Sequence, residues 1–293
     1  MNPFLGALQN LESEHQRMQK QSVRNTTSLF ADDPHEGTYC CLGCKKEIKR
    51  TYVPFIKKYG ISTACPCVVA EREREQLESD RRYRKGKMER VFSRSIMNDN
   101  LKQATFQNFI KREGTESVLS AFKEFVRTYE SRKTGILAYG PPGNGKSHLA
   151  ASAHHTLDHQ GYVCLFLDFP QLVEIAKGTF KNHSKVSITD IVSAAVSCDL
   201  LTLDELGAGS LTEFEYKDLL FPILNGRQGK LTNFTTNLNL EQLEMWLYKD
   251  KSGNVLDEQG RLFDRILGSV DIYENKGTSK RREDALKRLN EGQ

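Results

Sequence analysis

The sequence predicts an α/β protein in which helices flank a parallel sheet, preceded by a small cysteine-rich domain. From about residue 134, short apolar runs alternate with longer helical patterns, which is typical of a parallel sheet covered by helices. A glycine-rich phosphate-binding motif lies between one apolar run and the helical pattern after it. The N-terminal domain is predicted because five of the seven cysteines fall between residues 40 and 67.

Length and composition set the class of protein. A chain of 293 residues is longer than most single domains, and 38% hydrophobic with 27% charged residues is typical of a soluble globular protein. No apolar run is long enough to span a membrane, and the N-terminus does not have the pattern of a signal peptide. We therefore expect a cytoplasmic protein with no membrane partner.

Four segments follow one another along the chain. Residues 1–39 are expected to form a short helix, over 4–22, and a polar linker. The cysteines define a metal-binding module over 40–70. Alternating Glu and Arg over 68–94 predict an exposed helix, so that 71–100 form a charged helical linker to a nucleotide-binding domain at 101–293. The positive charge is local, since residues 40–100 contain 15 Lys or Arg and 8 Asp or Glu, whereas the whole chain has a net charge of only +4.

The sheet is expected to contain five strands with helices between them, and the polar residues 275–293 are expected to form a frayed tail. The predicted strands are Gly135–Tyr139, Tyr162–Asp168, Leu200–Asp204, Asn233–Thr236 and Val270–Tyr273.

A phosphate loop follows the first strand. The segment 140–147 fits GxxxxGK[S/T] in full and precedes a helix expected over Lys146–His159. Lys146 is placed to reach the β- and γ-phosphates and Ser147 to hold Mg²⁺, while an accidental match in a Gly/Pro turn is the alternative. The residues expected to bind the nucleotide are Gly140, Pro141, Pro142, Gly143, Asn144, Gly145, Lys146, Ser147 and His148.

An acidic pair ends the third strand. Asp204 is expected to bind Mg²⁺ through water, and Glu205 to activate the attacking water. A carboxylate after an apolar strand can also be a loop or capping residue, but this pair follows a complete phosphate loop. The pair favours hydrolysis over phosphoryl transfer to a small molecule, and the absence of [N/T]KxD argues against a GTPase.

Four motifs together resemble the AAA+ helicase loaders of the DnaC and DnaI type, with the IstB-type transposition ATPases as near relatives. They are GPPGNGKSHLA at 140–150, LLTLDELG at 200–207, TTNL at 235–238 and GRLFDRI at 260–266, and the resemblance covers about 105–282. It implies an AAA+ ATPase that binds ATP and Mg²⁺ and self-associates. In this family Asn237 corresponds to the sensor of the γ-phosphate and Arg265, supported by Arg261, to an arginine finger. An ion pair of Arg265 with Asp264 or Glu258 is the alternative.

The resemblance also implies contacts with single-stranded DNA. Phe180 matches the position of a stacking aromatic in the family, and Thr212 with Phe214 matches a second contact strip. Both phenylalanines could equally be core residues.

The N-terminal cysteines are at metal-ligand spacing. Cys41 and Cys44, with Cys65 and Cys67, resemble the zinc-bearing N-terminal domain of DnaI-type loaders, and four thiolates suit tetrahedral zinc. Cys40 could replace Cys41, and buried or incidental cysteines are the alternative reading.

The sequence therefore predicts an ATP-dependent loader whose zinc module binds a replicative hexameric helicase and whose ATPase domain binds single-stranded DNA. An IstB-like transposition helper and an adaptor that uses ATP only as a switch are the alternatives. The zinc module argues against the first alternative, and Glu205 argues against the second.

Overall fold

The computed structural model describes residues 38–40, 44–53, 58–61, 66–92, 96–180 and 185–291. The chain divides into two compact units, Met1–Ser79 and Asp80–Gln293, and helix α2 (Pro66–Phe92) contains the division. Each unit is described by itself.

The first unit contains a three-stranded antiparallel sheet. Its strands β1 (Thr38–Cys40), β2 (Glu47–Val53) and β3 (Lys58–Ile61) are ordered β1-β2-β3. The helix expected over 4–22 lies outside the described residues.

Helix α2 differs from the exposed helix that its charge pattern predicts. Residues 69–80 are exposed, but Met88 and Phe92, one turn apart, are buried in the core of the second unit. Arg84 forms an ion pair with Asp199, and Lys87 donates a 2.6 Å hydrogen bond to the Ser193 hydroxyl. The last turns of α2 are thus part of the folded core.

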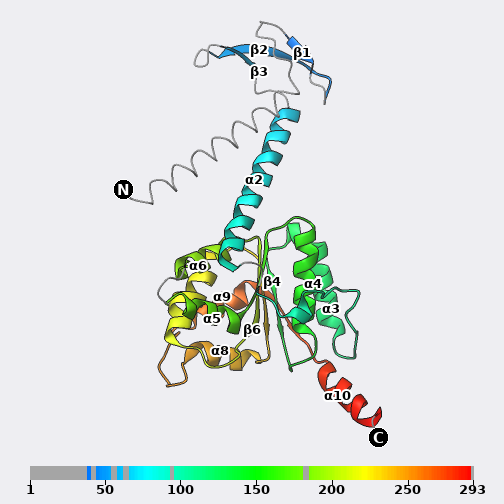
Figure 1. Ribbon diagram of the computed structural model, residues 1–293, viewed down its shortest axis with the longest axis vertical. Coiled ribbons are helices and arrows are strands. Elements are labelled where there is room, and N and C mark those ends of the chain that lie inside the picture. The colour runs from blue at the N-terminus through cyan, green and yellow to red at the C-terminus, as the bar shows by residue number, and fades with distance from the viewer. Residues whose placement is uncertain are drawn as a thin grey trace. The chain divides into compact units, whose positions relative to one another are not determined.

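The second unit is built on a five-stranded parallel sheet, which confirms the α/β prediction (Figure 1). The strand order is β5-β6-β7-β4-β8. Strand β6, which contains Asp204 and Glu205, therefore lies between β5 and β7, and β4 lies beside β7. The carboxyl ends of these parallel strands meet at one edge of the sheet. The strands are β4 (Gly135–Tyr139), β5 (Cys164–Asp168), β6 (Leu200–Leu206), β7 (Thr232–Thr236) and β8 (Val270–Glu274).

Helices cover both faces of this sheet (Figure 1). On one face lie α3 (Glu116–Arg127) and α4 (Lys146–His159). The other face carries α5 (Phe169–Gly178), α6 (Ile188–Ser197), α7 (Phe221–Gly226), α8 (Leu240–Tyr248) and α9 (Arg261–Gly268). Short helical turns occur at Asp99–Leu101, Tyr129–Ser131 and Glu215–Leu220.

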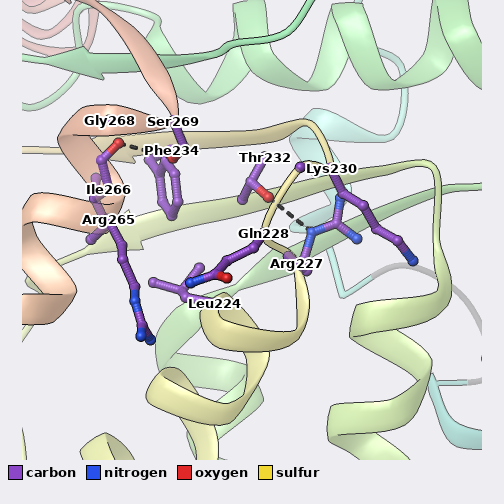
Figure 2. Close-up of a pocket in the computed structure, with 11 residues that line it drawn as sticks. Leu224, Arg227, Gln228, Lys230, Thr232, Phe234, Arg265, Ile266, Gly268 and Ser269 are labelled. Atoms are coloured by element: carbon purple, nitrogen blue, oxygen red, sulfur yellow. Dashed lines mark hydrogen bonds between the residues drawn. The ribbon is translucent and has the colours of Figure 1, made fainter.

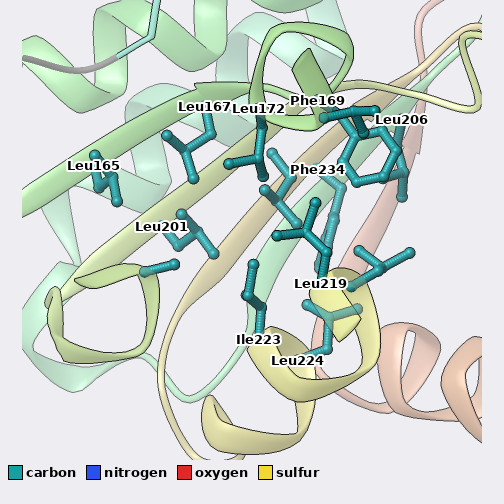
Figure 3. Packing of buried hydrophobic residues seen from close by; sticks show 14 of the residues in the cluster. Leu165, Leu167, Phe169, Leu172, Leu201, Leu206, Leu219, Ile223, Leu224 and Phe234 are labelled. Carbon is teal, nitrogen blue, oxygen red and sulfur yellow. The ribbon is translucent and has the colours of Figure 1, made fainter. Parts of the chain in front are cut away.

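Each face has its own hydrophobic cluster, because successive strand residues point to opposite sides. Ile136 packs in the cluster with α3 and α4, whereas its neighbour Leu137 packs in the other. Figure 3 shows the second cluster, in which Leu201 and Phe234 of the sheet face Ile223 of α7. The sheet is therefore buried on both sides and holds its carboxyl edge rigidly.

The C-terminal residues correct the prediction of a frayed tail. Asn275 and Gly277 are buried beside the phosphate loop, and α10 (Lys280–Glu291) follows. The polar composition concealed this because these residues are buried through hydrogen bonds and close backbone packing. In the part of the chain that the structure describes, no helix is long and apolar enough to cross a membrane.

Candidate active site

The phosphate loop joins β4 to α4 at the carboxyl edge of the sheet. Gly143 and Gly145 have φ of 78° and 97°, in the left-handed region that favours glycine, and Gly145 caps α4. A Cβ at Gly145 would lie 2.6 Å from Cε2 of Phe109, so a side chain does not fit there. The loop backbone and the N-terminus of α4 together form a site of positive potential suited to phosphate.

Lys146 connects this loop to the end of β7. Its ammonium donates to the carbonyl oxygens of Gly140 (2.7 Å) and Pro141 (2.8 Å), and to the side-chain oxygens of Asn144 (3.1 Å) and Asn237 (3.0 Å). Burial lowers the pKa of Lys146 to about 8, against the opposing influence of nearby Asp204 and Glu205. The structure thus brings the predicted lysine and the predicted sensor into direct contact.

Asp204, near the end of β6, lies at the same edge and is 1% exposed. Burial raises the pKa of Asp204 to about 6, although hydrogen bonds from Thr235 and Ser147 lower it. The hydroxyl of Ser147 and this carboxylate are in contact and are both oxygen ligands of the kind Mg²⁺ takes, so these residues fit a magnesium ion.

Glu205 follows in an unusual conformation. Its φ of 58° is left-handed, and the pairing of β6 with β7 shifts register between Leu203 and Leu206. Such a backbone costs roughly 1 to 2 kcal/mol and persists only when its surroundings enforce it. The left-handed turn interrupts the regular strand backbone directly after Asp204. The carboxylates of Asp204 and Glu205 therefore occupy different positions.

Several residues at this edge escaped the sequence prediction. Thr235 belongs to a predicted strand and to the TTNL motif, but the sequence predicts no contact for it, and it hydrogen-bonds Asp204. Asp168 is the register partner of Asp204, and its carboxylate caps α5 by accepting from the backbone N–H of Gln171. Asn275 and Arg112 both contact the phosphate loop from distant parts of the chain. Only Asp168, an acid after an apolar strand, carried a recognisable signal.

His148 contacts the segment before α3. Its Nε2 lies 3.0 Å from the carbonyl oxygen of Thr105, and its ring centroid is 5.5 Å from that of Phe109. The Pro141 and Pro142 side of the loop is exposed.

Arg265 lies at the opposite edge of the sheet. It lines a pocket of about 260 Å³ with Thr232, the first residue of β7, and Ser269, just before β8 (Figure 2). Its guanidinium stacks 5.0 Å from the ring centroid of Phe221, and it forms no ion pair with Asp264, Glu258 or any other described acid. The ion-pair alternative is therefore wrong within the described residues. Arg261, at the start of α9, donates instead to Gln259 (2.8 Å).

The residues expected at DNA lie together beyond α5. Phe180 is 68% exposed, and its ring centroid is 5.2 Å from that of half-buried Phe214. Thr212 and Glu215 bond each other's backbone N–H, so Thr212 acts as a helix cap. Phe180 is thus not a core residue, whereas Phe214 also packs against the larger cluster.

Of the expected zinc ligands, Cys44 and Cys67 lie in the described chain and Cys41 and Cys65 outside it. Among the described residues, no three His, Cys, Asp or Glu side chains form a metal-binding group.

Comparison with known proteins identifies relatives of this chain. The family described as IstB-like ATP binding protein matches residues 73–288. The replicative helicase loader DnaC of Escherichia coli (strain K12) is 29% identical over 167 residues, covering 56% of this chain and 67% of that protein.

Two solved structures share the fold. The crystal structure of DnaI has a TM-score of 0.51 and 22% identity, covering 61% of this chain and 95% of DnaI. A replication initiator DnaA bound to AMPPCP and single-stranded DNA has a TM-score of 0.50 and 25% identity, covering 67% of this chain and 57% of that one. These similarities confirm the AAA+-like fold.

Proposed function

This chain belongs to the IstB-like ATP-binding protein family and is an AAA+ ATPase, and we propose that it loads a replicative hexameric helicase onto single-stranded DNA. The single observation that carries the proposal is the assembled site at the sheet edge, where Lys146 joins the phosphate loop to Asn237, in a chain related to the loader DnaC.

The binding half of the reaction is assigned to the phosphate loop. The N–H groups of the loop and the ammonium of Lys146 hold the β- and γ-phosphates, and Asn237 contacts the γ-phosphate from β7. Ser147 and Asp204 would hold a magnesium ion, which would neutralise charge on the phosphates when bound.

The hydrolytic half is assigned to Glu205. The left-handed turn sets its carboxylate apart from that of Asp204, so one acid serves the metal and the other takes a proton from the attacking water. Asp204 is the buried acid of the two, and Glu205 is partly exposed, as a residue that contacts water must be.

Self-association is supported by Arg265. Arg265 is half-buried, has no ion-pair partner among the described residues and lies at the edge opposite the phosphate loop, so it is placed to reach the nucleotide of a neighbouring copy and not its own. We assign it as an arginine finger that acts between subunits, with Arg261 one turn earlier in support.

Single-stranded DNA is assigned to the exposed pair of aromatic rings. Phe180 presents most of its surface to solvent at a position where a base can stack. Phe214 supports its ring edge-on, and Thr212 fixes the turn that carries Phe214. The related initiator DnaA structure, which holds single-stranded DNA, is consistent with this assignment.

The helicase is assigned to the N-terminal unit, with zinc bound by Cys41 or Cys40, Cys44, Cys65 and Cys67. Two of the proposed ligands lie in described residues: Cys44 shortly before β2, and Cys67 in the first turn of α2. Four thiolates would join these segments in a domain too small to have a large core.

A reconstitution tests the function as a whole. The full chain is mixed with a replicative helicase hexamer, circular single-stranded DNA and ATP, and helicase retained on the DNA is measured after gel filtration. We expect retention to need the chain and ATP, and Phe180→Ala to reduce it while ATPase activity without DNA persists. No association with any replicative helicase, together with ATP-dependent binding of duplex DNA and a transposase, would instead establish the transposition helper.

A further inference from the structure

The segment after β8 lies against the first half of the phosphate loop. The backbone N–H of Asn275 donates to the carbonyl oxygen of Tyr139 (2.7 Å), and that of Lys280 donates to Gly143 (3.0 Å). A Cβ on Gly143 would lie 2.4 Å from the hydroxyl oxygen of Ser279. The C-terminal residues therefore contact the loop backbone from its start to Asn144.

Two buried asparagines form the centre of this contact. Asn144 and Asn275 are both 0% exposed. The side-chain amide of Asn144 donates to the Asn275 carbonyl oxygen (2.7 Å), and the amide of Asn275 donates back to the Asn144 carbonyl oxygen (3.3 Å). The remaining side-chain oxygen of Asn144 accepts from the ammonium of Lys146 (3.1 Å). A single residue, Asn144, thus links Asn275 to the phosphate-binding lysine through hydrogen bonds.

Arg112 reinforces the same carbonyl group from the segment before α3. Its guanidinium donates to the carbonyl oxygens of Asn144 (3.0 Å) and Thr278 (2.6 Å), and its side chain is 12% exposed. A buried carbonyl that accepts two such bonds loses both if the peptide rotates, which opposes any other orientation of the loop. Arg112 also joins the loop to the C-terminal segment that contacts it.

We propose that Asn275 and Arg112 are positioning residues of the ATPase site, which hold Asn144 so that the loop N–H groups and Lys146 face the phosphates. The proposal rests on the function assigned above to the phosphate loop and Lys146. It makes residues 275–280 part of the nucleotide site although they lie about 130 residues after the loop in sequence.

The test compares ATP binding and turnover in Asn275→Asp, Asn275→Ala and Arg112→Gln with the full chain. Asn275→Asp preserves shape and the acceptor for the Gly277 N–H, but loses the donor to Asn144. Each variant is expected to raise the dissociation constant of ATP by about tenfold, as loss of a buried hydrogen bond does. Arg112→Lys, which retains one donor and the charge, should recover part of the affinity.

Matched controls separate positioning from stability. Arg127→Gln and Asn290→Ala change the same residue types at exposed sites and should bind ATP normally. Val118→Ala, in the core on the face with α4, should lower the melting temperature without changing ATP affinity. A reduced ATP affinity confined to the Asn275 and Arg112 variants therefore supports the positioning role. An equal loss of affinity in Val118→Ala overturns it.

The outcomes also separate this proposal from the assigned site. Suppose that Lys146→Ala abolishes ATP binding, but the Asn275 and Arg112 variants have ATP dissociation constants within about twofold of that of the parent. Only the positioning role is then overturned. If Lys146→Ala itself binds normally, the assigned phosphate site fails first. Should Asn275→Ala not fold, Arg112→Gln decides the question, because Arg112 contacts the Asn144 and Thr278 carbonyl groups, and Glu283 at 3.9 Å, through its side chain alone.

Discussion

The hydroxyl group of Thr235 donates a hydrogen bond to the carboxylate of Asp204 and accepts one from the backbone N–H of Glu205 (3.1 Å). One side chain on β7 thus holds both acids at the end of β6. Two residues later, Asn237 contacts Lys146. The end of β7 is therefore in contact with both halves of the site, and a change in it can reach the lysine and the acids together.

We expect Thr235→Val to lower kcat for ATP hydrolysis by about 10- to 100-fold, because the change removes the acceptor of the Glu205 N–H and one of the two hydroxyl groups that bond the buried Asp204 carboxylate. Thr235→Ser retains the hydroxyl and should stay near the activity of the parent. Steady-state phosphate release measures the effect, and equal rates in the two variants would show that the hydroxyl is unimportant.

Lys146→Ala should abolish ATP binding, because it removes the cation that joins the phosphate loop to β7. Titration with a fluorescent ATP analogue measures the affinity, and Lys123→Ala on the exposed face of α3 is the matched control. Normal affinity in Lys146→Ala would remove the phosphate-site assignment.

Glu205→Gln should bind ATP normally but turn it over at least about 100-fold more slowly, because an amide cannot take a proton from water. The side chains are isosteric, so the backbone at this position is unchanged. Binding and single-turnover hydrolysis are measured on the same preparation, and unchanged turnover would place the base elsewhere.

The acid stability of the protein should depend on His154. Burial lowers the pKa of His154 to about 3, so the folded state keeps it neutral while the unfolded chain takes up a proton below about pH 6.5. Above pH 6.5 the effect is absent. As the pH falls from 6.5 to 3, this group lowers the free energy of unfolding by as much as about 4 to 5 kcal/mol.

His154→Phe retains the ring packing against Phe166 and should remove much of this acid sensitivity. Urea unfolding of both proteins at pH 7 and pH 5 measures the difference, with His159→Phe at the exposed end of α4 as control. The same loss of stability at pH 5 in all three proteins would contradict the prediction.

The N-terminal unit should contain about one zinc ion per chain. Metal analysis of the purified protein measures it, and the double variant Cys44→Ser, Cys65→Ser should lose the metal. Cys164 and Cys198 are buried in the second unit, so Cys164→Ser serves as the control. Native protein without zinc would exclude the proposed ligand set.

Local patterns predicted most of the fold. Apolar runs bounded by turns predicted all five strands of the second unit within two residues at each end, because strands buried on both faces must be apolar. The phosphate loop was predictable because its glycines, lysine and serine are adjacent in sequence.

The contacts that the sequence did not reveal join distant segments. Asn275 meets Asn144 across 131 residues, and a polar residue within a polar segment gives no signal that it is buried. Met88 and Phe92 were concealed for a similar reason, since charged neighbours outnumber them in α2. Such positions are set by tertiary hydrogen bonds and packing, which periodicity does not record.

At Glu205 the backbone conformation favours one residue type, and the proposed chemistry requires another. Glycine would adopt a φ of 58° with little strain, so the residue best for folding there has no carboxylate. A search for more stable variants of this protein would therefore favour Glu205→Gly, which removes the carboxylate proposed above as the base. Stabilising substitutions should be chosen away from the end of β6, where backbone strain and the proposed base coincide.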